Sequence, residues 1–183
     1  MKAIEVRRWT REEYDRMNAA GMFAAGERIE LVDGEILRMT PQGSMHATAL
    51  RLLEDALRKK LGPGFDIRGQ LPLALGPSSE PEPDLAVVPG SPRDYKDAHP
   101  GGALLVVEIS EATLDYDRHR KGSLYARAGI EDYWIVNLIE HCVEVYRDPG
   151  QGGYRTRQVV RAGGRLAPPA APLVFIAIDD ILP

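Results

Sequence analysis

Cysteine is nearly absent from this chain of 183 residues, and aromatic residues make up only 7% of it. The single cysteine, Cys142, cannot form an intramolecular disulfide bond, which suits a protein of a reducing compartment. The longest hydrophobic runs, 103–107 and 173–178, fall far short of the ~20 residues that cross a bilayer. The first residues also lack the apolar stretch of a signal peptide. We therefore expect a cytoplasmic protein with no membrane partner.

An excess of basic residues is also lacking. The chain has 23 lysines and arginines against 27 aspartates and glutamates, which gives a net charge of -4. This excludes a histone-like protein that binds nucleic acid through its overall charge, although a nucleic-acid enzyme with a local basic surface is compatible with it. The 18 glycines and 14 prolines argue against a helical bundle and favour many strands and turns.

The N-terminal part predicts a short helix followed by a hairpin. Thr10 and Glu13 have the spacing of a capping box, which predicts a helix that ends near Gly21. The pair Asp33-Gly34 separates two runs of β-forming residues, and this predicts a hairpin over 28–40.

The remaining chain alternates between helical and extended patterns. A helix is expected over 45–61, with Ser44 as its N-cap, and a second over 115–128, weakened by Gly122. Strands are expected over 65–75, 84–88, 103–110, 132–138, 142–147, 154–160 and 173–178.

From residue 45 the order is therefore helix, three strands, helix, strand. This order predicts a mixed α/β (α+β) fold with one sheet covered by helices. The length fits a single domain over residues 1–183. Within it we expect an N-terminal helix and hairpin (1–43), a core (44–147) and a C-terminal β extension with extra strands (148–183).

Two acidic residues sit on otherwise apolar strand faces. Asp84 shares a face with Val88, and Glu108 shares one with Leu104, because side chains alternate along a strand. If these strands pair antiparallel with Val88 opposite Leu104, then Asp84 lies opposite Glu108. Adjacent carboxylates repel each other, and a hard cation such as Mg²⁺ or Mn²⁺ is the usual means of offsetting that charge.

The helix that follows brings a lysine into reach. Lys121 lies about six residues into this helix, or ~9 Å along it, so it reaches the level of the two acids if the helix folds back over the sheet. Asp117 and Tyr125 share its helix face. Two acids and a lysine suit phosphodiester hydrolysis, in which the acids hold the metal and the lysine positions the attacking water.

Several motifs together resemble a known family. They are RIELVDGEI at 28–36, PDLAVV at 83–88, VVEISEAT at 106–113 and DYWIV at 132–136. With His46, Asp117, Lys121, Tyr125 and Gly129, they resemble the Uma-type putative restriction endonucleases of the PD-(D/E)XK nuclease superfamily. The resemblance covers roughly residues 25–147.

The resemblance implies a restriction-endonuclease-like core and a Mg²⁺-dependent (or Mn²⁺-dependent) endodeoxyribonuclease. It implies that Glu30, Asp84, Glu108 and Lys121 are catalytic, and that the metal is held by Asp84, Glu108 and the backbone carbonyl of Ile109. Ser110 stands where the plain motif has a lysine, so the catalytic lysine is assigned to the following helix. DNA is the expected partner, with a homodimer if both strands are cut.

Further residues are candidates for the edges of this site. His46, Ser110, Asp117 and Tyr125 are candidates for lining it. The stretch 147–165 has five arginines and one aspartate, so its net charge is +4. It is the best candidate for phosphate contacts, although an ordinary solvated hairpin explains it equally well. These arginines are Arg147, Arg155, Arg157, Arg161 and Arg165.

Two alternatives remain beside the nuclease. A non-cleaving nucleic-acid-binding or scaffold module would keep the fold, although the intact set of three acids and one lysine argues against it. A glycoside hydrolase could use the carboxylate pair, but it needs an aromatic-lined cleft for which the chain has few residues.

Overall fold

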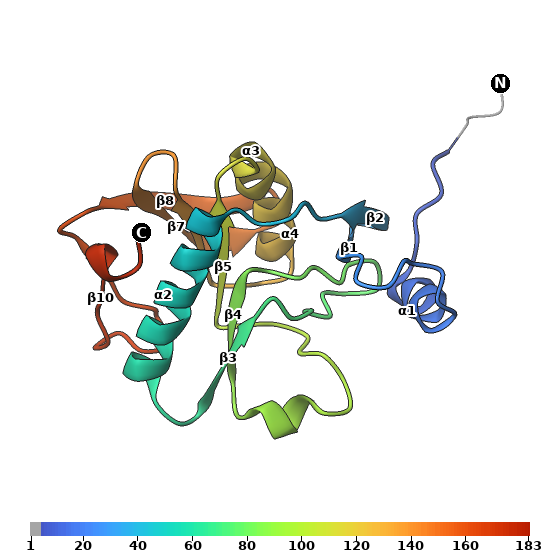
Figure 1. Cartoon of the computed structure of the whole chain (residues 1–183), viewed down its shortest axis with the longest axis horizontal. Coiled ribbons are helices and arrows are strands. Elements are labelled where there is room, and N and C mark those ends of the chain that lie inside the picture. The colour runs from blue at the N-terminus through green and yellow to red at the C-terminus, as the bar shows by residue number, and fades with distance from the viewer. Residues whose placement is uncertain (1–4) are drawn as a thin grey trace.

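Six strands form one central sheet in the computed structural model, which describes residues 5–183 (Figure 1). In sheet order they are β3 (Phe65–Gly69), β4 (Leu85–Pro89), β5 (Leu105–Ser110), β6 (Asp132–Asn137), β7 (Cys142–Gly150) and β8 (Gly153–Arg161). Neighbours in sequence are thus neighbours in the sheet. The pair β5–β6 is parallel and the other pairs are antiparallel. A parallel pair needs a crossover connection, and a helical segment over 114–127 supplies it.

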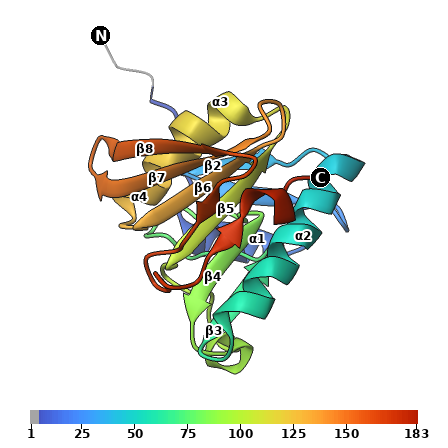
Figure 2. The same ribbon diagram turned by 90° about the vertical axis from the view of Figure 1, so that its left-hand side faces the viewer.

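Helices cover both faces of this sheet. Helix α2 (Ser44–Leu61) lies on one face, where Leu53 and Leu57 pack in a cluster with Val87 and Val107. The C-terminal strands β9 (Arg165–Leu166) and β10 (Ile176–Ala177) and the 3-10 turn η3 (Ile178–Asp180) close the same face (Figure 2).

The crossover segment covers the other face. It comprises α3 (Leu114–Tyr116), η2 (Asp117–Lys121) and α4 (Gly122–Arg127). Tyr125 of α4 packs there with Val88, Val106 and Tyr133. Because alternate strand residues point to opposite faces, Asp84 and Glu108 point to the side of α4. The predicted core order of helix, three strands, helix and strand is confirmed.

The N-terminal part forms the predicted helix and hairpin beside the sheet (Figure 1). Helix α1 (Arg11–Ala19) begins with the capping box of Thr10 and Glu13. Strands β1 (Ile29–Val32) and β2 (Glu35–Arg38) pair through the turn at Asp33 and Gly34, whose φ angles are 50° and 76°. Positive φ at both central residues is typical of the type I′ hairpin turn.

Four local predictions need correction. Ser44 is the first residue of α2, and the N-cap is Gly43, which has no side chain to cap with. The strand expected over 65–75 ends at Gly69, where Gln70 with its φ of 53° interrupts the extended backbone; beyond it, the amides of Leu73 and Leu75 still donate to the carbonyls of Pro81 and Ser79. The strand expected over 173–178 contains only Ile176–Ala177.

The fourth correction concerns the helix over 115–128. It is continuous, but its middle segment, η2, is a π-helix. Gly122 marks the return to α-helix and does not break it.

The 3-10 turn η1 (Pro92–Tyr95) lies in the loop between β4 and β5. Among residues 5–183, no helix is both long and apolar enough to cross a membrane.

Candidate active site

The acids Asp84 and Glu108 lie opposite each other where β4 meets β5. The observed register pairs Leu85 with Val107 and Val87 with Leu105, and one further step along it sets Asp84 against Glu108. This is the register that the sequence predicts. The Asp84 amide lies 3.4 Å from Oε2 of Glu108, so the two acids meet at the strand ends.

Asp84 is held by donors from four parts of the chain. Its Oδ2 accepts hydrogen bonds from the Ile109 amide (2.8 Å) and His46 Nε2 (3.0 Å), while Oδ1 lies 3.2 Å from Gln70 Nε2 and 3.4 Å from Gln42 Nε2. Burial acts to raise the pKa of Asp84, but His46 and the Ile109 amide outweigh it and lower that pKa. Asp84 is therefore ionised.

Gln42 and Gln70 are contacts that the sequence did not reveal. Gln70 follows β3 with a φ of 53°, an uncommon conformation for a residue with a side chain. Its amide donates to the Asp84 carbonyl, and its side chain reaches the Asp84 carboxylate. The only sequence signal for Gln70 is its place just after a strand, which by itself points to no function.

Glu108 and Lys121 form a buried ion pair. Lys121 Nζ lies 2.9 Å from Glu108 Oε1, and the Tyr125 hydroxyl donates to the same oxygen at 2.6 Å. Glu108 and Lys121 are each only 3% exposed. Burial raises the pKa of Glu108 and neighbouring carboxylates such as Asp84 add to this, whereas the Lys121 ammonium acts to lower it. Burial alone would lower the pKa of Lys121, but the surrounding carboxylates, Glu108 foremost, raise it.

The π-helical turn η2 brings Asp117 to the same site. Asp117 and Lys121 are the two buried residues of this turn. Thr113 donates a hydrogen bond to Asp117 Oδ2 at 2.6 Å. Burial raises the pKa of Asp117, partly offset by Thr113 and Lys121. Such π turns are rare and frequently occur at functional sites.

Glu30 reaches this group from the hairpin. Its Oε2 lies 3.2 Å from Lys121 Nζ and accepts the Glu82 amide at 3.1 Å. The β1–β2 hairpin thus adds a second carboxylate within 4 Å of the Lys121 ammonium. The hairpin is attached to the segment before β4 by the β-bridge between Leu31 and Glu80.

A cavity of about 360 Å³ opens onto these groups. The ionisable residues from the prediction that line it are Glu30, His46, Asp84, Glu108, Asp117 and Lys121. Ser110 and Tyr125 do not line it, which corrects the prediction that they would. Ser110 is fully buried behind Glu108, on the same side of β5, and Tyr125 contacts the cavity only through Glu108.

The donor set of the cavity fits a hard divalent cation. Five carboxylates and three cationic side chains (Arg28, Arg38 and Lys121) line it, so carboxylates remain in excess when the charges are counted. In the described part of the chain, no three His, Cys, Asp or Glu side chains are close enough to hold a metal by themselves. Mg²⁺ does not need such a cluster, because it commonly binds one or two carboxylates and completes its shell with water and substrate phosphates.

The arginines of the C-terminal extension lie elsewhere. Strand β8 is three strands from β5, or ~14 Å at the usual strand spacing. Arg155 is exposed, and Arg165 stacks 4.4 Å from the ring centroid of Phe175. The other three pair with carboxylates: Arg147 with Asp132, Arg157 with Glu144 and Arg161 with Glu140. None of the five lines the cavity.

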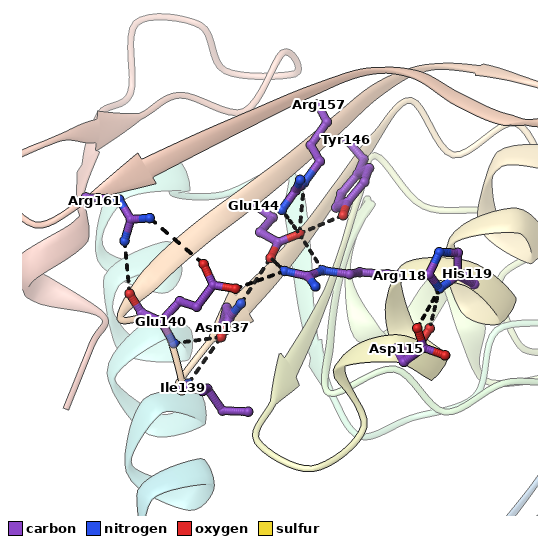
Figure 3. Close-up of polar contacts among 10 residues, drawn as sticks. All are labelled: Asp115, Arg118, His119, Asn137, Ile139, Glu140, Glu144, Tyr146, Arg157 and Arg161. Atoms are coloured by element: carbon purple, nitrogen blue, oxygen red, sulfur yellow. Dashed lines mark hydrogen bonds and ion pairs between the residues drawn. The ribbon is translucent and has the colours of Figure 1, made fainter.

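A second buried charge cluster anchors the π-helical turn (Figure 3). Glu144 of β7 is fully buried and accepts hydrogen bonds from Arg118, Arg157, Asn137 and Tyr146. Burial would raise the pKa of Glu144, but these donors, Arg118 first, lower it to about 2. Because Arg118 belongs to η2, this ion pair ties the turn that carries Lys121 to the sheet.

Comparisons with known proteins agree with this architecture. The profile of the Uma2 family, described as "Putative restriction endonuclease", matches residues 11–179. The crystal structure of a putative nuclease belonging to DUF820 from Anabaena variabilis ATCC 29413 has a similar fold, with a TM-score of 0.71 and 18% sequence identity over 94% of this chain and 96% of that chain. No curated protein matches the chain.

Proposed function

The chain belongs to the Uma2 family of putative restriction endonucleases, and from this premise we propose that it is a metal-dependent endonuclease that hydrolyses phosphodiester bonds in DNA. The observation that carries the proposal is the pairing of Asp84 with Glu108 in one cavity, with the Lys121 ammonium 2.9 Å from Glu108.

We assign the metal to Asp84, Glu108 and the backbone carbonyl of Ile109. Oε2 of Glu108 is the oxygen that Lys121 and Tyr125 leave unused. The amide and carbonyl of one strand residue point to the same edge, so the Ile109 carbonyl faces the side of Asp84, which accepts its amide. A bound Mg²⁺ or Mn²⁺ would polarise the phosphate and lower the pKa of a coordinated water.

Lys121 is the residue that we assign to water positioning and charge stabilisation. An ammonium group has three hydrogens to donate. Glu108 and Glu30 accept two of them, at 2.9 and 3.2 Å. The third is left for an oxygen in the cavity that Lys121 lines. A fixed positive charge there stabilises the negative charge that develops on the phosphate in the transition state.

Other residues hold these groups in place. Tyr125 and Lys121 fix the Glu108 carboxylate from the helical side, while Glu30 fixes Lys121 from the hairpin. His46 directs its Nε2 at Asp84. We also propose a homodimer, because a chain with one such cavity needs a second copy to cut both strands of a duplex at one place.

A non-cleaving nucleic-acid-binding or scaffold module is the second candidate. The observation that favours it is that protein donors already bind both acids: four donors contact Asp84, and Lys121 and Tyr125 contact Glu108.

Incubation with supercoiled plasmid, single-stranded DNA and RNA, in Mg²⁺, Mn²⁺ or EDTA, separates the two candidates. The nuclease cleaves DNA with either cation, does not cleave it in EDTA, and loses cleavage on Glu108→Gln. Binding of DNA without cleavage in every condition would favour the scaffold. Sedimentation of the protein with and without duplex DNA tests the dimer, and a monomer that linearises plasmid in one binding event would contradict it.

A further inference from the structure

Polar atoms without partners are concentrated around the acid cavity. Within residues 5–183, six buried side-chain nitrogen or oxygen atoms lack a hydrogen-bond partner. Three of them, Arg28 Nη2, His46 Nδ1 and Tyr116 Oη, belong to residues that line this one cavity. Folded proteins pair nearly all of their buried polar groups, so a concentration of unpaired ones at a cavity indicates a ligand that supplies the partners.

Arg28 and Tyr116 are the two that have no other role in the site. His46 already binds Asp84 through Nε2. Arg28 lies two residues before Glu30, and its side chain forms no ion pair or hydrogen bond with any residue that the structure describes. Tyr116 lies directly before Asp117, at the start of the π-helical turn. Both residues therefore lie close in sequence to a carboxylate of the site, and neither Arg28 Nη2 nor Tyr116 Oη forms a hydrogen bond with it.

Their chemistry matches a phosphate group. A guanidinium group donates paired hydrogen bonds to phosphate oxygens, and a phenol hydroxyl donates one more. A phosphodiester entering a cavity with five carboxylates is repelled unless positive charge receives it. Lys121 is already shared between Glu108 and Glu30, and Arg38 pairs with Glu27 at 3.5 Å. Arg28 also lines the cavity, and among the described residues it has no carboxylate within 4 Å, although its charge partly offsets the effect of burial, which raises the pKa of the more distant Glu82.

We propose that Arg28 and Tyr116 bind the phosphodiester group of the substrate, and that they, and not the arginines of 147–165, form the phosphate subsite of this chain. The inference rests on the proposed nuclease function, and it names how that same site recognises its substrate. Two observations favour this subsite over the arginines of 147–165. The arginines of β8 lie three strands from the acids, and three of the five arginines of 147–165 (Arg147, Arg157 and Arg161) are paired with carboxylates.

The test compares Arg28→Ala, Arg28→Lys and Tyr116→Phe with the unchanged protein and with Arg16→Ala, a matched control. Arg16 is an exposed residue of α1 that lies outside the cavity. The affinity for a short fluorescein-labelled DNA duplex is measured by anisotropy in Ca²⁺ over a series of salt concentrations. Plasmid cleavage in Mn²⁺ and thermal melting are measured in parallel.

We expect Arg28→Ala to weaken duplex binding about tenfold and to reduce the salt dependence of the affinity by about one phosphate contact. Arg28→Lys should restore the salt dependence but only part of the affinity, because lysine keeps the charge and loses the paired geometry. Tyr116→Phe should weaken binding or cleavage about threefold or more without lowering the melting temperature, since it removes a hydroxyl that has no partner in the free protein.

The outcomes distinguish a failure of the phosphate subsite from a failure of the proposed nuclease function. If the unchanged protein cleaves DNA while Arg28→Ala and Tyr116→Phe behave like Arg16→Ala, the subsite is wrong and the nuclease stands. If Arg155→Ala and Arg165→Ala reduce the salt dependence and Arg28→Ala does not, the phosphate contacts belong to the arginines of 147–165. If the unchanged protein neither binds nor cleaves any nucleic acid, the proposed function fails and the subsite fails with it.

Discussion

The Lys121 ammonium lies 2.9 Å from Oε1 of Glu108, and both groups are almost completely buried. A second carboxylate, Glu30, lies 3.2 Å from the same ammonium. Charges in such an environment depend on one another, because each would be costly to bury alone. The residue that the family resemblance marks as catalytic is therefore also a structural partner of the acids.

Lys121→Ala should accordingly abolish cleavage and also lower the free energy of unfolding. Removing one member of a buried ion pair typically costs ~3–5 kcal/mol, since the remaining charge has no partner. Urea denaturation at pH 7.5 measures the loss. The double variant Glu108→Gln/Lys121→Met removes both charges and should lose less than the two single variants combined. Additive losses would show that the pair is not coupled.

Mn²⁺ should raise the melting temperature of the unchanged protein, because a cation that binds only the folded state stabilises it. Asp84→Asn should cancel that increase. It should also destabilise the metal-free protein by ~1–2 kcal/mol, because an amide NH₂ would replace an acceptor oxygen, either Oδ2, which faces Ile109 N and His46, or Oδ1, which faces Gln70. Melting curves with and without Mn²⁺ measure both effects. The idea of a metal held by Asp84 is refuted if both proteins respond equally to Mn²⁺.

Glu144 should make the protein sensitive to acid. Its pKa of about 2 in the folded protein lies below the ordinary value of 4.5. The unfolded chain therefore takes up a proton first as the pH falls, so the contribution of Glu144 is complete above about pH 4.5 and is lost as the pH falls through about 2. At pH 7, Glu144→Gln should cost ~2–3 kcal/mol, and the difference from the unchanged protein should shrink towards pH 2.5.

Urea titrations of both proteins at pH 7, 4 and 2.5 test this. The same variant should reduce cleavage at pH 7 even at temperatures where it stays folded, because the Arg118 contact no longer holds the η2 turn. A difference in stability that does not change with pH would mean that Glu144 has the same pKa in the folded and in the unfolded protein.

Gly34 should tolerate no side chain, because two constraints act on it. Its φ is +76°, and an added Cβ would lie 2.7 Å from the Cβ of Arg8. Gly21 has a similar φ of +67° but open space around it, so Gly21→Ala is a matched control for the conformational part. Gly34→Ala should cost ~2–4 kcal/mol, and Gly21→Ala about 1 kcal/mol. Equal losses would show that the contact with Arg8 relaxes freely.

The sequence by itself determined the features that follow from local pattern. The Asp33-Gly34 pair requires a tight hairpin because few other dipeptides adopt positive φ twice. The alternation along 84–88 and 103–110 determined which side chains share a face, and hydrophobic burial then leaves one register, which places Asp84 opposite Glu108. Helical spacing likewise placed Lys121 and Tyr125 on one side, and both reach Glu108.

Only the tertiary structure decided the contacts between segments far apart in the chain. Gln42 lies 42 positions before Asp84 and Arg118 lies 26 before Glu144, and no local pattern specifies either approach. The π-helical turn was also invisible, because propensities do not distinguish one extra residue in a helix. The ion-pair partners of the arginines could not be predicted for the same reason. A cluster of arginines in sequence says nothing of which carboxylates fold against it, and packing alone paired Arg157 with Glu144 while leaving Arg28 unpaired at the cavity.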